Sequence, residues 1–198
     1  MAGPSRAPLR AELVDTCRAM LRSGLAVATT GNASVRSGDS VLISPTSLPY
    51  EQMEPADVVE IDLDGLVTEG RREPSSEWRV HCAVYRARPD VQAIVHTHSP
   101  HAVAWSFLGA PLDTGTEEIE HYAGGPVSTA PFAPTGGEEL ALAAVAALGD
   151  RRAVLMARHG VLGCGASLRA ALDTCAVVEQ QAQVAWLLRR HPSGDGPG

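Results

Sequence analysis

The sequence lacks the features of a membrane or secreted protein. No apolar run approaches the roughly 18 residues that a membrane-spanning helix requires. The segment Met1–Arg10 contains Pro4 and Pro8 but no apolar stretch of the kind found in a signal peptide. We therefore expect a cytoplasmic protein that does not act at a membrane.

The chain also has no excess of positive charge and no CxxC motif. Its formal net charge is -7, whereas general binding to nucleic acid requires a basic surface that neutralises phosphates. None of the four cysteines stands in a CxxC pair, so we expect the reduced thiols of an intracellular protein. Nucleic acid is therefore not an expected partner.

The composition is that of one globular domain. The 198 residues are 44% hydrophobic and 20% charged, which is ordinary for such a domain and sufficient for a sizeable core. No internal repeat and no linker divides the chain. We assign residues 1–190 to a single domain and residues 191–198, HPSGDGPG, to a tail that is disordered by its composition.

Hydrophobic spacing, capping residues and turn residues predict helices and strands along this domain. Helices are expected at residues 6–23, from Ser75 or Ser76 to the Arg88-Pro89 stop, from Pro100, and at residues 138–148 and 168–190. Strands are expected in hairpins that turn at residues 37–39 and 64–65, in AIVHTH at residues 93–98, and in a pair at residues 153–165. Residues 109–136 are predicted as loop and short strand. The mixture predicts a layered α/β domain with a partly antiparallel sheet.

Three of the seven histidines stand close together in the segment VQAIVHTHSPHAVAWS, at positions 96, 98 and 101. On a strand, side chains two residues apart point to the same face. His96 and His98 would then lie side by side, and both imidazoles could reach one ion at the zinc–nitrogen distance of about 2.0–2.1 Å. The alternative is a pair of surface or hydrogen-bonded histidines without a metal.

Two other metal motifs containing HxH do not match. The HxHxDH pattern of metallo-β-lactamase-type zinc hydrolases needs a carboxylate where this chain has Pro100, and a proline side chain cannot bind a metal. A cupin-type site needs a carboxylate about four residues after the pair, where Ala102 and Val103 supply none. A further ligand must therefore come from elsewhere in the chain.

Candidates for that ligand lie both upstream and downstream. His159 follows the apolar segment 153–156 and precedes a glycine, so it stands at a strand end, where sites are commonly built. His81 lies four residues after Glu77 on a predicted helix, so these two could form a metal pair on one helix face. His121 lies in an acidic loop, and a simple hydrogen-bonded histidine is the alternative for each.

Five segments in this order resemble the class II aldolase and adducin family, and within it the zinc aldolases of the fuculose-phosphate type. They are TTGNASVR, ISPTSLPYEQM, PSSEWRVHCAVYRARPD, VHTHSPH and RHGVL, and the resemblance extends from the first predicted helix to about Arg190. It implies a single three-layer αβα domain around a central, mostly antiparallel mixed sheet. It also implies a ring-shaped homotetramer with an active site at each subunit boundary.

The resemblance implies His96, His98 and His159 as ligands of one Zn²⁺ per chain, with Glu77 at the metal site as a catalytic acid/base. It further implies a pocket for the phosphate of a sugar substrate, formed by Gly31, Asn32, Thr46, Ser47, Ser75 and Ser76. These residue types suit an oxyanion independently, because hydroxyls, a Gly-Asn turn and the N–H groups at a helix start are neutral donors.

The implied reaction is the cleavage or formation of a ketose 1-phosphate. Three neutral histidines leave the zinc ion its positive charge and open coordination positions. The ion would stabilise the enediolate that remains when the C3–C4 bond breaks, and Glu77 would protonate that enediolate. In the direction of condensation, Glu77 would remove the proton from dihydroxyacetone phosphate.

The loop GTEEIEHYAGG departs from the pattern of the fuculose-phosphate aldolases. Their tyrosine, which reaches a neighbouring subunit's site, would stand at Glu118, and Tyr122 is displaced by four residues. A second tyrosine of that pattern, near the C-terminus, has no counterpart. We expect Glu120 and Tyr122, with Glu118 and His121 as alternatives, to handle protons at a neighbouring site. The alternative is an exposed acidic loop without such a role.

Three further members of the same family remain as alternatives. Ribulose-phosphate 4-epimerases have an aspartate acid/base in this loop, and Glu120 occupies a similar place. However, these epimerases have SSD where this chain has Ser75-Ser76-Glu77. Methylthioribulose-phosphate dehydratases resemble the predicted site as well. An adducin-like head domain has the fold without the zinc ligands, and the histidines disfavour it. The glutamate favours an aldolase.

Overall fold

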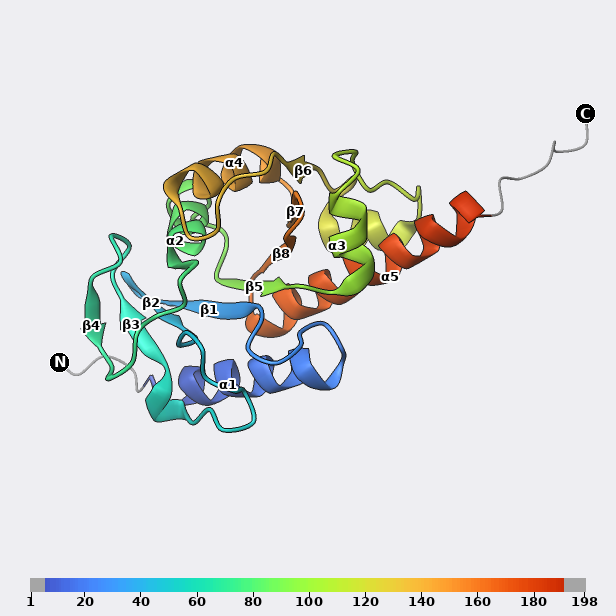
Figure 1. The fold of residues 1–198 in the computed structure, drawn as a ribbon. Coiled ribbons are helices and arrows are strands. Elements are labelled where there is room, and N and C mark those ends of the chain that lie inside the picture. The colour runs from blue at the N-terminus through green and yellow to red at the C-terminus, as the bar shows by residue number, and fades with distance from the viewer. Residues whose placement is uncertain (1–5, 191–198) are drawn as a thin grey trace, which may run out of the picture.

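The computed structural model describes residues 6–190, and its centre is one sheet of eight strands (Figure 1). Across the sheet the strands follow the order β4-β3-β2-β1-β5-β8-β7-β6. All neighbours are antiparallel except β6 and β7, which are parallel. The strands are β1 (Asn32–Ser37), β2 (Ser40–Ile43), β3 (Val59–Ile61), β4 (Val67–Glu69), β5 (Ala93–Thr97), β6 (Thr129–Ala130), β7 (Ala153–Met156) and β8 (Gly160–Gly165). The expected mostly antiparallel mixed sheet is confirmed.

Helices cover both faces of this sheet and complete the predicted three layers. On one face lie α1 (Ala7–Arg22), α3 (Pro100–Ser106) and α5 (Leu168–Arg190); on the other lie α2 (Trp78–Ala87) and α4 (Glu138–Leu148). In Figure 1, α1 lies below the sheet, whereas α2 and α4 lie above it. Each face has its own apolar core, because the strands alternate their side chains between the two.

The alternation along β5 determines on which face the site is built. Ala93 and Val95 pack into the core with α1 and α5, whereas Ile94 packs into the core with α2 and α4. By the same period, His96 projects towards the face of α2 and α4. Asn32, opposite His96 in the β1–β5 register, lies on that face too.

The hairpin turns follow the predicted residues. Gly38 has a φ of +63° between β1 and β2, a left-handed conformation that favours glycine. Gly65, in the connection between β3 and β4, has a φ of +85°, and a Cβ atom there would lie 2.2 Å from the ring of Trp78. Glycine is thus required at this turn by its backbone conformation and by its contact with α2.

Two local predictions were wrong in detail. Neither Ser75 nor Ser76 is the N-cap of α2: the N-cap is Glu77, and residues 75–77 form a turn in which Ser75 Oγ accepts a hydrogen bond from the Glu77 N–H at 3.3 Å. Part of the predicted loop is a π-helical turn, η2 (Ile119–Ala123), which ends at Gly124 with a φ of +82°. Arg152 donates hydrogen bonds to the carbonyl oxygens of Tyr122 and His121, so contacts from distant sequence hold this turn.

Two other predictions concern the C-terminal tail and the absence of a membrane-spanning helix. The predicted disordered tail, residues 191–198, lies outside the described residues. Within residues 6–190, no helix combines the length and the apolar character needed to cross a membrane.

Candidate metal centre and active site

Four side chains from separate segments meet at one point. His96 lies in β5 and His98 just beyond it, His159 lies in the turn between β7 and β8, and Glu77 precedes α2. The Nε2 atom of His96 lies 2.8 Å from that of His98 and 3.3 Å from that of His159. One ligand atom from each of the four residues lies within 4.8 Å of the others. The structure thus brings together the whole set that was predicted for the metal.

The orientation of the rings fits a cation. Nδ1 of His96 lies 2.9 Å from the carbonyl oxygen of Val161, and because a carbonyl only accepts, this nitrogen carries the ring proton. Nε2 of the neutral ring then presents a lone pair to the nitrogens of His98 and His159. Where His98 and His159 also present lone pairs, a positive ion among the three nitrogens relieves their repulsion. Three imidazole nitrogens and a carboxylate are a donor set that binds zinc.

The two oxygens of Glu77 have different surroundings. Oε2 accepts a hydrogen bond from Nδ2 of Asn32 at 2.8 Å and lies 3.2 Å from Nε2 of His96. Oε1 lies 3.1 Å from Nε2 of His159, and this buried atom makes no hydrogen bond. One oxygen is therefore held in place, while the other faces the histidines.

Burial and charge act together on these groups. Burial by itself would raise the pKa of Glu77, but His96 and His159 outweigh it and hold the pKa of this carboxyl well below its usual value. Burial, reinforced by His96 and His159, lowers the pKa of His98 to about 3. Burial lowers the pKa of His96, but the Glu77 carboxylate outweighs it and raises that pKa. The ionised carboxylate thus draws positive charge to this point, which a bound cation would also supply.

The backbone of two neighbouring segments lies close to His96. A Cβ atom at Gly31 would lie 2.5 Å from the carbonyl oxygen of His96, and one at Gly160 would lie 2.2 Å from that of Thr97 and 3.1 Å from Cε1 of His96. Glycine at both positions lets β1 and β8 pack against the metal-binding end of β5. Neighbouring Arg158 has a φ of +60°, and its N–H donates to Ser106 Oγ at 3.0 Å, which anchors the turn that carries His159.

A cavity of about 230 Å³ opens beside this cluster. All the residues predicted for the phosphate line it, and Glu77, His98 and His159 lie in the same wall. Its rim carries the exposed hydroxyl residues Thr46, Ser47 and Ser76. Sequence reasoning missed Thr29, Thr30 and Thr135, which also line the cavity; the only available signals were the repeated threonine before Gly31 and the Thr-Gly-Gly step before α4.

Asn32 has a more specific environment than the one predicted for it. Its side chain lies between Glu77 and His81: Nδ2 donates to Oε2 of Glu77, and Oδ1 lies 2.6 Å from Nε2 of His81. His81 is directed to Asn32 and Ser34 and is not part of the metal-ligand group, so the alternative Glu77–His81 metal pair is not formed. His101 is paired with Glu179 of α5 at 2.8 Å.

The loop residues predicted to handle protons lie elsewhere in this single chain. Glu120, His121 and Tyr122 belong to η2, and none of them lines the cavity beside the histidines. Tyr122 instead borders a shallow hollow with residues of α5, among them Arg169 and Asp173. Within one chain, the structure does not bring Glu120 and Tyr122 to Glu77.

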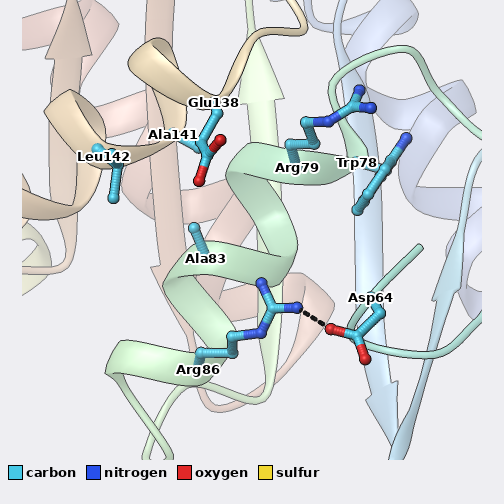
Figure 2. Close-up of a pocket in the computed structure, with 8 residues that line it drawn as sticks. All are labelled: Asp64, Trp78, Arg79, Ala83, Arg86, Glu138, Ala141 and Leu142. Atoms are coloured by element: carbon cyan, nitrogen blue, oxygen red, sulfur yellow. Dashed lines mark hydrogen bonds and ion pairs between the residues drawn. The ribbon is translucent and has the colours of Figure 1, made fainter.

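Another cavity, of about 200 Å³, lies between α2 and α4 (Figure 2). Its charged residues are largely engaged with each other or with backbone: Arg86 pairs with Asp64 at 2.5 Å, and Arg79 donates to the carbonyl oxygen of Gly136. Ala83, Ala141 and Leu142 supply an apolar wall. Among the described residues it contains no group of converging metal ligands, so the histidine cluster is the better candidate for chemistry.

Comparison with known proteins gives a consistent result. Residues 11–186 match the model of the family described as "Class II Aldolase and Adducin N-terminal domain". An L-fuculose phosphate aldolase from Escherichia coli O6:H1 is 41% identical over 179 residues, which cover 90% of this chain and 83% of that protein. A 5-methylthioribulose-1-phosphate/5-deoxyribulose-1-phosphate aldolase from Rhodospirillum rubrum is 39% identical over 182 residues, 92% of this chain and 82% of that protein. A solved L-fuculose 1-phosphate aldolase structure superposes with a TM-score of 0.91 at 32% identity and covers 100% of this chain and 92% of its own.

Proposed function

The chain belongs to the class II aldolase and adducin family, and from that premise we propose that it is a zinc-dependent aldolase acting on a ketose 1-phosphate. The predicted family is confirmed, and so is the prediction of an enzyme of the lyase class. The observation that carries the proposal is the convergence of Glu77 and three histidine Nε2 atoms in the wall of a cavity rimmed by hydroxyls.

The residues that would hold the metal are His96, His98 and His159, with Glu77 adjacent. Zinc suits the three imidazole nitrogens, and it leaves positions open for a substrate. When bound, such an ion acts as a Lewis acid that stabilises negative charge developing on a substrate oxygen. The hydrogen bond from Nδ1 of His96 to the carbonyl oxygen of Val161 orients one ligand before any metal binds.

Glu77 is placed to move a proton. Cleavage between C3 and C4 of a ketose 1-phosphate releases an aldehyde and leaves an electron pair on C3, which must then be protonated to give dihydroxyacetone phosphate. Oε1 of Glu77 is buried, makes no hydrogen bond and lies beside the ligand cluster. As an ionised carboxylate, Glu77 is the base that removes this proton in condensation. In cleavage it must first take up a proton, which it then delivers to C3.

The cavity rim supports recognition of a phosphate. Thr46, Ser47 and Ser76 are exposed hydroxyl residues, and Ser75 lies behind them at the turn before α2. These neutral donors can hold a phosphate by hydrogen bonds. The positive end of the α2 dipole adds a favourable charge interaction. We assign these residues and Gly31 to binding of the phosphate. The side chain of Asn32 contacts Glu77 and His81, so we assign only its backbone to the phosphate.

A second subunit would complete the site. Cleavage also requires a base that removes the proton of the hydroxyl on C4, whereas Glu77 is assigned to the proton on C3. Glu120 and Tyr122 lie on η2, away from the cavity of their own chain. We infer a homotetramer in which this loop reaches the neighbouring cavity.

Metal analysis and a cleavage assay test the proposal together. We expect about one zinc per chain, lost on His96→Ala, His98→Ala or His159→Ala. The zinc-loaded protein should release dihydroxyacetone phosphate from one or more of a panel that includes L-fuculose 1-phosphate and 5-deoxyribulose 1-phosphate. The matched unphosphorylated ketoses are the control for the phosphate pocket.

Other outcomes would contradict this assignment. Epimerisation of a ribulose phosphate without cleavage would favour the epimerase members of the family. Loss of water from methylthioribulose 1-phosphate would favour a dehydratase. Full metal binding by His159→Ala, together with metal loss in His81→Ala, would show that the ligand set is wrong.

A further inference from the structure

We propose that His81 is a positioning residue: it orients the side-chain amide of Asn32, and this amide in turn holds Glu77 by one oxygen. The inference rests on the proposed function of Glu77. It is drawn from a buried chain of hydrogen bonds between β1 and α2 that ends at Glu77, and no step of the proposed reaction uses the side chains that lead to it. Its members are Tyr85, Ser34, His81, Asn32 and Glu77.

The contacts in this chain are short and shielded from water. The hydroxyl of Tyr85 lies 2.8 Å from Ser34 Oγ, and Ser34 Oγ lies 2.6 Å from Nδ1 of His81. Nε2 of His81 lies 2.6 Å from Oδ1 of Asn32. His81 and Ser34 are fully buried. Water therefore cannot substitute for a missing partner without a cavity being opened.

The direction of every bond in the chain follows from Glu77. An ionised carboxylate only accepts, so Asn32 must turn its NH₂ group to Glu77 and its oxygen to His81. His81 must then donate from Nε2, which leaves Nδ1 of the neutral ring as an acceptor. Ser34 donates to Nδ1 and accepts from Tyr85. Each polar group has a partner only in this arrangement.

The charge state of His81 supports this assignment. Burial lowers the pKa of His81 to about 3, so the ring is neutral at ordinary pH. A neutral ring has one donor and one acceptor, which the Asn32–Ser34 pair uses fully. A doubly protonated ring would face Ser34 with a second donor and would remove the acceptor that the hydroxyl needs.

Loss of the donor at Nε2 has a consequence for Glu77. Without it, Oδ1 of Asn32 is left buried and unpaired, and rotation of the amide would place that oxygen against the carboxylate. The hydrogen bond to Oε2 would then be lost, and with it the restraint that directs the free Oε1 towards the histidines. His81 thus acts on the proton-transfer group through Asn32 without touching the substrate.

The two amide replacements of histidine separate positioning from packing. In His81→Gln the side-chain nitrogen can take the place of Nε2 and still donate to Asn32. In His81→Asn the shorter amide reaches only the place of Nδ1, so the donor is lost. Val80→Ala, one residue earlier in α2 and buried in the core, is the control for loss of helix stability alone.

If His81 acts by positioning, its replacement should change activity but not metal content. We expect His81→Asn to lower kcat by about 10–100-fold with KM nearly unchanged and zinc retained, the usual size of an effect through a neighbouring residue. His81→Gln should keep kcat within about threefold of the wild type, as should Val80→Ala. Equal loss in the Gln and Asn variants, in proportion to their stability, would overturn the proposal, and so would a normal kcat in His81→Asn.

A spectroscopic test does not depend on turnover. Nitrogen-15 NMR of the zinc-loaded wild type should show His81 neutral with its proton on Nε2. A proton on Nδ1 in an active enzyme would overturn the positioning role and leave the aldolase assignment standing. A proton on Nε2 in a protein that cleaves none of the ketose phosphates would contradict the aldolase assignment and support the hydrogen-bond chain.

Discussion

The two oxygens of Glu77 show how a single residue can combine a fixed position with reactivity. Asn32 holds Oε2 at 2.8 Å, while Oε1 is buried without a hydrogen bond. A buried acceptor without a partner is costly in a folded protein, by about 1–3 kcal/mol. Such a cost is found at functional sites, where a metal, a substrate or a proton supplies the missing interaction.

Replacing Glu77 with glutamine tests this role. We expect Glu77→Gln to keep its metal and its fold but to lower turnover by roughly 10²–10⁴-fold, because the amide preserves the shape of the side chain and removes the titrating group. Zinc content and the rate of dihydroxyacetone phosphate release are the measurements. The exposed Glu139→Gln in α4 is the matched control and should behave as the wild type.

A nearly normal turnover in Glu77→Gln would contradict the assignment. The proton would then come from another group, and Glu120 would be the first to replace. Loss of zinc in Glu77→Gln would instead show that this carboxylate contributes to metal retention.

At the scale of elements, the close packing of β5 and β8 places the ligands. Gly160 begins β8 beside the end of β5, and the register sets His96 opposite Leu162. Any side chain at Gly160 would collide with the carbonyl oxygen of Thr97 and approach the His96 ring. The hairpin between β7 and β8 can therefore bring His159 to His96 only with glycine at this position.

Substitution of Gly160 should affect stability and metal binding together. We expect Gly160→Ala to cost about 1–3 kcal/mol of unfolding free energy, as other overpacked sites do, and to lower zinc occupancy because β8 must move away from His96. Denaturant unfolding and metal analysis are the measurements. Gly38→Ala is the control: it has a φ of +63° and open space around it, so it should lose about 1 kcal/mol and no zinc.

An alanine at Gly160 that left both stability and zinc content unchanged would show that the two strands can separate without disturbing the ligands. The close contact would then have no role in placing the metal site.

At the scale of the whole molecule, the proposed chemistry is incomplete within one chain. The cavity contains Glu77 and two of the three histidines, but Glu120 and Tyr122 lie on η2, which packs against α5. Arg152 holds the carbonyl oxygens of this turn, so its acidic and aromatic side chains are presented in a defined way. This defined presentation supports our proposal that the loop reaches the cavity of a neighbouring subunit.

Complementation between two inactive chains tests that idea. A Glu77→Gln chain retains an intact loop, and a chain with Glu120→Gln and Tyr122→Phe retains an intact Glu77. If each site combines two chains, mixed tetramers should regain activity at the boundaries where intact parts meet. Co-expression with two different tags, followed by tandem purification, would supply the mixed oligomers for assay; the two pure variants are the controls.

Two results would contradict this assembly. One is scattering or sedimentation that shows an active monomer. The other is a purified mixed oligomer that recovers no activity although it contains both chains and a full complement of zinc.

Much of this protein could be predicted from local sequence. Hydrophobic spacing predicted α4 and α5 at their observed bounds. The signals that start and stop a helix, apolar periodicity and flanking glycines, lie within a few residues of its ends. The two-residue period of a strand predicted that His96 and His98 point to one side, although β5 ends at Thr97. Local pattern made His159 and Glu77 candidates among others, and only the resemblance to the family joined them to that pair.

Other features depend on contacts between distant segments, and only the tertiary structure decided them. The turn η2 is held by Arg152, which lies 30 residues after Tyr122 and donates to its carbonyl oxygen. The local sequence predicted only a loop there. Asn32 lies in a Gly-Asn step typical of an anion site, yet the packing of α2 on β1 directs its side chain to Glu77 and His81. Local patterns determine which face a side chain takes, because backbone periodicity is local. Which atoms then meet depends on how whole elements pack, and therefore on every residue between them.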